Sequence, residues 1–574
     1  MTNRRLGVYM CYCGGNISDY VDVERVREVI AAEPGVVVAK TAMSMCSDAA
    51  QQEIVKDIEE EKLDGLVVAS CSPKLHMFTF RGAARRAGLN PYLYTQVNVR
   101  EQCSWAHTDD REAATEKEIR LIRAGIAKTM LSEPLEPIRI ETVPRVLVVG
   151  GGIAGLRASV GLADIGLSVI LIERAERAGG WVGELGTMYP HGREGKELIA
   201  QLVREVKDRK NITLYTNAEL VGKSGSMGDF TVRIRAGAEE ITANVGTIIV
   251  ATGFDSYHPE VGEYGYGIDG VVTLPEFKAL LDCTEGTLSL GGRKIEDIVY
   301  VYCVGSRQDE EKENPNRYCS RYCCNAAVHA SLVAGEKNPT ARQYHLFRDM
   351  RTYGKYELLY NQSREAGANY LRFAEDEPPV VEKCADGRLK VTVKDLLTYG
   401  EEMEITADVV VLVTGMVPRP NDSLVSLLKL PVGRDRFYNE IHPKLRPVET
   451  MVDGVLICGA CQGPKNSAEA VASALTAAAQ SAAILKKGYV ELDPLMAAVN
   501  RELCDGCGEC LGACPYQAIV MDEAAGRKTA AVNQVGCKGC GGCVPVCPKG
   551  AIDLKGYTDA QIRLMIDGFL KETM

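Results

Sequence analysis

Short apolar runs alternate with amphipathic stretches through the first 130 residues of this 574-residue chain. Compact apolar runs predict buried strands, and longer stretches with one polar face predict helices. In order, the pattern predicts strand Leu6–Met10, helix Asp22–Ala32, strand Val36–Lys40, helix Asp48–Glu61, strand Gly65–Ala69, helix Lys74–Ala87 and strand Tyr92–Val99. Alternation of strands and helices indicates a parallel sheet, so residues 1–140 are expected to form a small α/β domain.

A second α/β region is expected at 141–490. Strand Arg145–Gly150 leads into a GxGxxG loop and a helical stretch, and the next strand, Ser168–Ile172, ends at an acidic residue. In this context the glycines let a pyrophosphate approach a helix N-terminus, and the acidic side chain accepts a hydrogen bond from a ribose hydroxyl. The predicted cofactor-binding residues of this unit are Gly150, Gly152, Gly155, Glu173 and Arg174.

Three later features favour FAD over NAD. A Gly-Gly-Trp sequence follows the second strand, strand Thr247–Ala251 enters a Thr-Gly turn, and strand Gly454–Cys458 enters a turn before the Ala-rich helix Ala468–Leu485. They add Gly180, Thr252, Gly253, Gly459 and Gln462 to the predicted cofactor-binding residues. In contrast, strand Asp297–Tyr302 is followed by no glycine-rich phosphate loop. Residues 286–408 are therefore expected to be a vestigial NAD(P)-type subdomain.

Composition narrows the class of protein. The chain is 46% hydrophobic and 25% charged, with a net charge of −11, which argues against a dedicated nucleic-acid binder. We find no apolar run as long as a membrane span and no signal peptide, so a cytoplasmic protein is expected.

The 21 cysteines point to metal ligation, because thiols stay reduced in the cytosol. Two C-x2-C-x2-C-x3-C-P runs lie 33 residues apart near the C-terminus. In this spacing three thiolates hold one [4Fe–4S] cluster and the fourth ligates the other cluster. We assign Cys504, Cys507, Cys510 and Cys547 to one cluster, and Cys537, Cys540, Cys543 and Cys514 to the other. The alternative, a pair of zinc knuckles, normally uses two CxxC pairs and a long spacer. Residues 491–574 are thus predicted to be a bacterial-type ferredoxin domain. After the cysteine runs, Thr558-x-x-Gln561 predicts a capping box that begins a helix through Lys571.

Two further cysteine groups are predicted cluster sites. Cys303, Cys319, Cys323 and Cys324 form the first, beside the predicted flavin. The second contains Cys11, Cys13, Cys46, Cys71 and Cys103, each at or near the end of a predicted strand. Which four of these five ligate stays open, and free thiols are the alternative for the flavin-side group. Four [4Fe–4S] clusters and one FAD are expected in total.

The chain resembles HdrA, the iron–sulfur flavoprotein of heterodisulfide reductase, over nearly its whole length. The motifs that carry the resemblance are Cys11–Ile17 (CYCGGNI), Ala69–Pro73 (ASCSP), Arg100–Trp105 (REQCSW), Cys303–Arg307 (CVGSR), Tyr318–Cys324 (YCSRYCC), Cys458–Lys465 (CGACQGPK) and Gly556–Asp559 (GYTD). The resemblance implies a thioredoxin-reductase-like, two-dinucleotide-domain flavoprotein that transfers electrons inside an anaerobic complex. In some family members the FAD bifurcates electron pairs.

The resemblance also implies partners. These are disulfide-reducing B- and C-like subunits, ferredoxin, and a hydrogenase, formate dehydrogenase or NADH-oxidising module. A dimer within a hetero-oligomer is expected, with no nucleic acid and no membrane span.

Two departures from the family pattern bear on bifurcation. No cysteine occurs between Cys103 and Cys283, so an extra ferredoxin insert of some members is absent. His329 stands where bifurcating members carry a lysine near the flavin, whereas Glu276 matches an acidic position there. We therefore predict Glu276 and His329 as the catalytic residues, with a weaker cationic role for histidine.

Three alternatives remain open at this point. One is a non-bifurcating conduit for a quinone-linked or acyl-CoA reductase complex. Another is an NAD(P)H-dependent reductase similar to the small subunit of glutamate synthase, which requires a nucleotide loop that we do not find. The third is a scaffold whose clusters are only structural.

Overall fold

The computed structural model describes residues 4–190, 192–524 and 526–571, which form two compact units. One unit combines 1–140 with 491–574, and the other is 141–490. Residues that were predicted as separate N-terminal and C-terminal domains thus belong to one compact unit.

The N-terminal part of the first unit is a four-stranded parallel sheet in the order β2-β1-β3-β4. Its strands are β1 (Leu6–Cys11), β2 (Val36–Ala42), β3 (Gly65–Ser70) and β4 (Tyr94–Asn98). Four helices accompany them: α1 (Val23–Ala31), α2 (Asp48–Glu60), α3 (Pro73–Arg86) and α4 (Arg111–Met130). Each begins after an Asp or Ser whose side chain accepts a hydrogen bond from the first turn, which is the usual N-cap.

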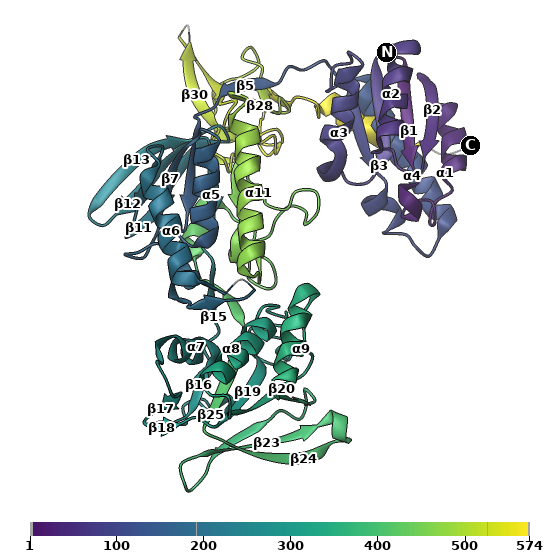
Figure 1. Ribbon diagram of the computed structural model, residues 1–574. Helices are drawn as coiled ribbons and strands as arrows, with labels where there is room; N and C mark the ends of the chain where they lie inside the picture. Colours follow the sequence, from purple (N-terminus) through teal and green to yellow (C-terminus); the bar gives the residue numbers. More distant parts are fainter. Residues whose placement is uncertain (1–3, 191, 525, 572–574) are drawn as a thin grey trace. The chain divides into compact units, whose positions relative to one another are not determined.

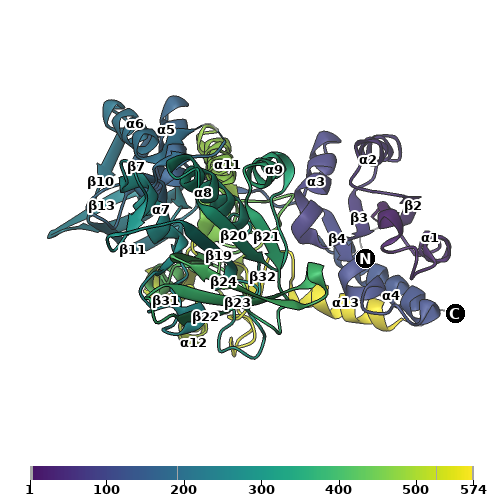
Figure 2. The same cartoon turned by 60° about the horizontal axis from the view of Figure 1, so that its bottom comes forward.

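The C-terminal part of this unit consists of short elements. They are β29 (Ala497–Val499), α12 (Glu509–Gly512), β30 (Ile519–Ala524), β31 (Arg527–Val532), β32 (Ile552–Leu554) and α13 (Asp559–Leu570). The capping box expected at Thr558 and Gln561 is present at the start of α13. This helix lies along α4 (Figure 2), where the Lys128 ammonium is 3.9 Å from the centre of the Tyr557 ring. Glu33 also pairs with Lys571 at 2.6 Å, which ties the last residue that the structure describes to the N-terminal domain.

The 141–490 unit begins with the parallel sheet β10-β7-β6-β14-β27 (Figure 1). Its strands are β6 (Arg145–Val149), β7 (Ser168–Ile172), β10 (Ile212–Tyr215), β14 (Thr247–Val250) and β27 (Val455–Ile457). Around it lie α5 (Ile153–Asp164), α6 (Gly195–Asp208), α10 (Asp422–Leu428), α11 (Ser467–Leu485) and the antiparallel strands β11 (Ala218–Ser226), β12 (Asp229–Ala236) and β13 (Glu239–Val245). The core strands are almost wholly apolar, as expected for a sheet covered on both faces.

A second sheet in this unit has the order β16-β25-β19-β20-β21. Its strands are β16 (Val271–Thr273), β19 (Asp297–Val304), β20 (Arg342–Phe347), β21 (Asn369–Arg372) and β25 (Val409–Thr414), with helices α7 (Leu274–Cys283), α8 (Cys323–Lys337) and α9 (Glu357–Glu365). A three-stranded antiparallel sheet follows: β22 (Val380–Lys383), β23 (Leu389–Asp395) and β24 (Glu401–Ala407). The remaining strands are β5 (Ile138–Glu141), β8 (Thr187–Met188), β9 (Arg193–Glu194), β15 (Phe254–Ser256), β17 (Ser289–Leu290), β18 (Arg293–Lys294), β26 (Met416–Pro418) and β28 (Tyr489–Leu492).

Helix α11 matches the predicted Ala-rich helix Ala468–Leu485. Among the described residues it is the one helix long and apolar enough to cross a membrane by length and composition, although no such segment was expected. Its alanines Ala474, Ala477 and Ala478 are buried in the flavin-type core, and the helix lies along α5. A packed core helix passes the same test, so the finding is weak evidence for a membrane span.

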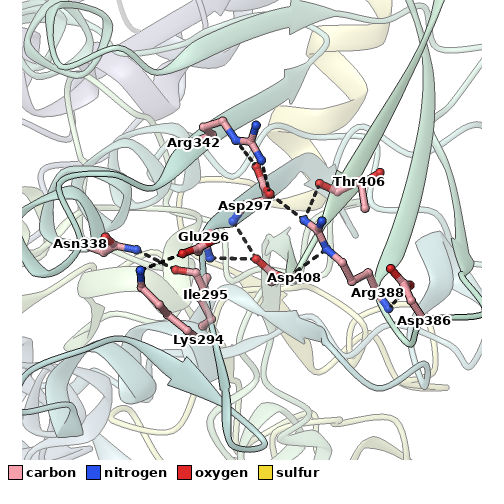
Figure 3. Close-up of polar contacts among 10 residues, drawn as sticks. All are labelled: Lys294, Ile295, Glu296, Asp297, Asn338, Arg342, Asp386, Arg388, Thr406 and Asp408. Carbon is pink, nitrogen blue, oxygen red and sulfur yellow. Dashed lines mark hydrogen bonds and ion pairs between the residues drawn. The ribbon is translucent and has the colours of Figure 1, made fainter.

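An ion-pair network ties the antiparallel strands to the second sheet (Figure 3). Asp297, which is 2% exposed at the start of β19, accepts two hydrogen bonds of 2.6 Å from Arg342 and a third of 2.6 Å from Arg388. Arg388 also pairs with Asp408 at 3.2 Å. Because Arg388 lies in the turn between β22 and β23 and Asp297 lies in β19, this network links the antiparallel sheet to the second sheet.

We expect Asp297→Asn to lower the free energy of opening of the β19 amides by about 2 kcal/mol. A buried pair that loses one charge costs about 3–5 kcal/mol, and the solvent exposure of Arg342 reduces that cost. Native-state hydrogen exchange measures the change. The matched control is Asp269→Asn, which removes the exposed pair of Asp269 with Lys383 and should leave exchange of the β19 amides unchanged. Equal effects of the two substitutions on exchange of the β19 amides would show that burial of the network contributes nothing to the stability of this strand.

Candidate functional site

A glycine cradle lies where β6 meets α5. Gly150 has φ +112°, and a Cβ there would lie 2.4 Å from the carbonyl oxygen of Ala251. A Cβ at Gly155 would lie 1.8 Å from the carbonyl oxygen of Gly150. Neither position accepts a side chain, so the loop turns tightly and leaves the N-terminus of α5 open, as a pyrophosphate requires.

The predicted acidic residue stands at the end of the neighbouring strand. Glu173 accepts hydrogen bonds from the backbone N–H of Gly151 at 2.6 Å and of Ala175 at 2.8 Å. The carboxylate is therefore beside the cradle, in position for a ribose hydroxyl. Arg174, also predicted, is exposed to solvent.

Other predicted cofactor residues converge on the same edge of the sheet. A Cβ at Gly180 would lie 3.1 Å from the Cα of Gly152, so these two loops touch. Thr252 and Gly253 follow β14, and the Thr252 hydroxyl is buried without a hydrogen-bond partner within the described chain. Such an orphaned hydroxyl suits a site for a polar ligand. The residues present therefore fit a dinucleotide.

The turn after β27 contains the last two predicted cofactor-binding residues. Gly459 and Gln462 lie in a short 3-10 turn, Gly459–Gln462, after β27. The N–H of Gly459 donates to Ser473 at 2.7 Å, and the Gln462 amide donates to the carbonyl of Pro447 at 2.7 Å. These bonds fix the turn at the edge of the sheet next to β14, which pairs with β27.

Four cysteines collect at the corresponding end of the second sheet. Cys303 lies within β19 with φ +65°, whereas Cys323 and Cys324 begin α8 and are buried. Burial, then Cys324, raises the pKa of Cys303 to about 11, and Cys319 acts in the same direction. The pKa of Cys324 is lowered by a hydrogen bond from Cys323 and, more weakly, by nearby arginines. The structure thus brings the predicted flavin-side set together.

Four of the five N-terminal cysteines lie near one another, and the fifth lies apart. The Sγ of Cys11, the last residue of β1, accepts hydrogen bonds from the N–H of Cys13 at 3.3 Å and of Met45 at 3.4 Å. Burial raises the pKa of Cys11, and Cys13 and Cys46 raise it further. Burial also raises the pKa of Cys71 to about 12, with Cys13 and Cys11 again among its neighbours. Cys11, Cys13, Cys46 and Cys71 therefore face one another.

Cys103 belongs to different surroundings. Its thiol donates to the carbonyl of Ala114 at 3.1 Å, in α4. Burial raises its pKa to about 12, and the charged neighbours that affect it are Glu118 and Lys117, with no cysteine among them. This separation favours Cys103 as the cysteine outside the group of four, a choice that sequence order alone left open.

Arg100 is a site residue that the sequence analysis did not single out. Its guanidinium donates to the Sγ of Cys13 at 3.3 Å, pairs with Glu101 at 2.7 Å and stacks over the Trp105 ring at 4.5 Å. Its position in the Arg-Glu-Gln-Cys motif, three residues before Cys103, was the available signal.

The ferredoxin-type module groups its cysteines across the two repeats. Burial raises the pKa of Cys510, and the neighbours that raise it further are Cys507, Cys504 and Cys547. For Cys543 the corresponding neighbours are Cys537, Cys540 and Cys514. A small hollow is lined by all four cysteines of this second set. Each repeat therefore contributes three cysteines to one group and one to the other.

Backbone N–H groups point at sulfur at equivalent positions of the two repeats. The Sγ of Cys514 accepts from the N–H of Ala518 at 3.3 Å, and that of Cys547 accepts from Ala551 at 3.2 Å. Hydrogen bonds to sulfur raise cluster potentials and favour the thiolate. Within the described residues no three His, Cys, Asp or Glu side chains already converge as ligands of one metal ion.

Of the two predicted catalytic residues, Glu276 lies in a helix cap and His329 is largely buried. Glu276 completes the capping box of α7, since its carboxylate accepts from the Thr273 N–H at 2.7 Å and the Thr273 hydroxyl at 2.8 Å. Burial, then Lys278, lowers the pKa of His329 to about 4. The imidazole is thus neutral at neutral pH, so it supplies no positive charge there.

Comparisons with known proteins identify two domain types and a family for this chain. Residues 144–286 match the family model described as pyridine nucleotide-disulphide oxidoreductase, and 503–551 match the 4Fe-4S dicluster domain. An A-type iron-sulfur subunit of the CoB–CoM heterodisulfide reductase of Methanopyrus kandleri is 36% identical, covering 91% of this chain and 92% of its own. The A-type subunit of the H2:CoB-CoM heterodisulfide,ferredoxin reductase of Methanothermobacter thermautotrophicus is also 36% identical, covering 91% of each chain.

Similar solved structures cover part of the chain. Lactococcus lactis thioredoxin reductase has a TM-score of 0.41 at 20% identity, covering 60% of this chain and 99% of its own. Thioredoxin reductase of T. acidophilum has a TM-score of 0.40 at 18% identity, with the same coverage of each chain.

We expect Gly155→Ala to weaken flavin binding by at least about tenfold, because the new methyl group pushes the Gly150 carbonyl into the phosphate site. Flavin content after gel filtration and titration of the apoprotein with FAD measure the loss. Gly161→Ala in the same helix is the control, since its Cβ meets a flexible Leu475 methyl group at 3.3 Å and the Ala478 Cβ at an ordinary contact distance of 3.9 Å. Normal flavin affinity in Gly155→Ala would contradict the assignment of the cradle.

Proposed function

Because the chain belongs to the HdrA family of heterodisulfide reductase flavoproteins, we propose that it is the FAD- and [4Fe–4S]-containing electron-transfer subunit of a heterodisulfide-reductase-like complex. One observation carries the proposal: a dinucleotide cradle and four separate cysteine groups occur in a single chain. When bound, FAD exchanges electrons in pairs or singly, and a [4Fe–4S] cluster exchanges one at a time. The chain is an oxidoreductase subunit with a flavoprotein fold and a ferredoxin-type module.

The residues of the chain bind and tune these groups. The glycine cradle and Glu173 would hold the dinucleotide, and the four cysteine groups would hold four clusters. Backbone N–H donors at Cys514 and Cys547, and the Arg100 guanidinium at Cys13, would stabilise thiolate charge. The protein thus supplies positions and electrostatics, and the cofactors supply the redox chemistry.

The proposed partners follow from the names of the relatives. Those names include hydrogen, formate and ferredoxin as reactants with the CoB–CoM heterodisulfide. We assign this chain a donor module such as a hydrogenase or formate dehydrogenase, ferredoxin, and a disulfide-reducing subunit, in a cytoplasmic hetero-oligomer that contains a dimer of this chain. The 21 free thiols suit a reducing compartment.

A second candidate function is a conduit that relays electron pairs without splitting them. The neutral His329 favours it, because a cation beside the flavin would stabilise an anionic reduced form and a neutral imidazole does not. The order of the two one-electron reduction potentials of the flavin separates the candidates: crossed potentials indicate splitting, and normal order indicates relay.

Anaerobically purified protein is expected to contain about 16 iron atoms and one FAD per chain. Iron analysis, flavin analysis and a redox titration of the visible spectrum test this. About eight iron atoms would eliminate the N-terminal and flavin-side clusters, and colourless zinc-containing protein would eliminate the function. Clusters that stay in one oxidation state at physiological potentials would indicate a scaffold.

The N-terminal ligand set has its own test. Cys71→Ser should remove about four iron atoms per chain and leave the FAD, whereas Cys103→Ser should leave both unchanged, because Cys103 bonds to α4 away from the other cysteines. Iron-to-flavin ratios measure the outcome. Iron loss in Cys103→Ser with full iron in Cys71→Ser would reverse the assignment.

A further inference from the structure

The chain passes twice between the two sheets of the 141–490 unit. It leaves the flavin-type sheet through β15 (Phe254–Ser256) and returns through β26 (Met416–Pro418), and these strands pair antiparallel. Figure 1 shows β15 between the two sheets and their helices. A pair of short connecting strands is a natural hinge, because a few dihedral angles there can reorient one subdomain.

The cysteine-bearing loop after β19 packs directly on this hinge. The hydroxyl of Ser320, which is wholly buried, accepts a hydrogen bond from the N–H of Met416 at 2.9 Å. The Tyr318 hydroxyl donates to the carbonyl of Met416 at 3.0 Å. Residues on both sides of Cys319 therefore hold the returning strand.

The same loop also reaches the flavin subdomain itself. Asn316 accepts a hydrogen bond from Arg436, and the Tyr318 ring meets that of Phe437 edge-on, with centroids 5.4 Å apart. Asn316 and Phe437 are 3% and 1% exposed. These contacts join residues more than 100 positions apart. The ring contact of Tyr318 lies on the buried Phe437, whereas Arg436 reaches the buried Asn316 from an exposed position.

A third attachment lies close to a predicted cluster ligand. The backbone N–H of Arg321 donates to the Sγ of Cys319 at 3.4 Å, and its guanidinium pairs with Glu469 at 2.5 Å. The Tyr353 hydroxyl donates to the same carboxylate at 3.1 Å. Glu469 belongs to the capping box of α11, the helix that follows the Gly459–Gln462 turn. One residue thus links a cysteine sulfur to the helix next to the flavin cradle.

We propose that residues 305–322 form a strap that locks the second subdomain against the flavin subdomain, and that Asn316, Tyr318, Ser320 and Arg321 are positioning residues. The purpose of this lock rests on the proposed function, because electron transfer requires a fixed distance between the flavin and the neighbouring cluster. A hinge that moved freely would vary that distance. The strap restricts the hinge next to Cys319, the one cysteine that residues 305–322 contain.

The test uses substitutions on the flavin side of the strap, which leave the cysteines and the glycine cradle intact. Glu469→Gln removes the ion pair but keeps the capping box, because glutamine serves at this position as well as glutamate does. Arg436→Met removes the bond to Asn316. In the double variant we expect amide exchange in 254–256 and at Met416 and Val417 to be at least about tenfold faster than in the wild type, with unchanged exchange in β6 and β19.

The matched control is Glu240→Gln, which removes an exposed ion pair of Glu240 with Arg233 at 3.3 Å in the same unit. It should leave hinge exchange unchanged. Hinge exchange within twofold of the wild type in the double variant overturns the proposal. If β6 and β19 in the double variant also exchange faster, a second comparison uses Arg321→Gln and the conservative variant Arg321→Lys. Equal hinge exchange in these two variants also overturns the proposal.

Iron and flavin analysis of the wild type separates this inference from the proposed function. Wild-type protein without flavin or iron, together with faster hinge exchange in the double variant, would refute the function and leave the lock in place. Full flavin and iron content in the wild type, together with unchanged hinge exchange in the double variant, would support the proposed function and refute the lock.

Discussion

Crowding of buried sulfur is the constraint on which this structure depends. Burial raises the pKa of Cys11, Cys71 and Cys303, and neighbouring cysteines raise it further. A thiol must lose its proton to ligate metal, so several thiols this close become charged together only when a positive centre replaces their protons. Arg100 beside Cys13 and backbone N–H donors at Cys11 offset part of this cost before any metal binds.

Parallel sheets supply the geometry that this chemistry needs. The carboxyl ends of parallel strands meet at one edge, so residues distant in sequence converge there. In the N-terminal sheet this edge collects Cys11 and Cys71, which lie in and after neighbouring strands. At the corresponding edge of the flavin-type sheet, the cradle after β6 and the turn after β14 come together.

At the same edge, the second sheet of the 141–490 unit carries cysteines where the flavin-type sheet carries glycines. Where a nucleotide-binding sheet would continue into a glycine-rich loop, β19 contains Cys303 and then enters the loop that contains Cys319. The buried Asp297 network lies at the opposite end of β19, where it ties this sheet to β22–β24. The cysteine and the ion-pair network thus lie at opposite ends of one strand.

The sequence by itself determined the local features, because they depend on spacing along the chain. It predicted the α/β alternation, the glycine cradle with Glu173, the paired C-terminal cysteine runs and the capping box at Thr558, all of which are set within a few turns of backbone. Only the tertiary structure decided which distant groups meet. It separated Cys103 from the other N-terminal cysteines, committed Glu276 to a helix cap, and buried His329 so that its pKa falls to about 4. It also joined the C-terminal helix to the N-terminal domain. These outcomes depend on burial and on contacts between residues far apart in sequence, and neither is encoded in local spacing.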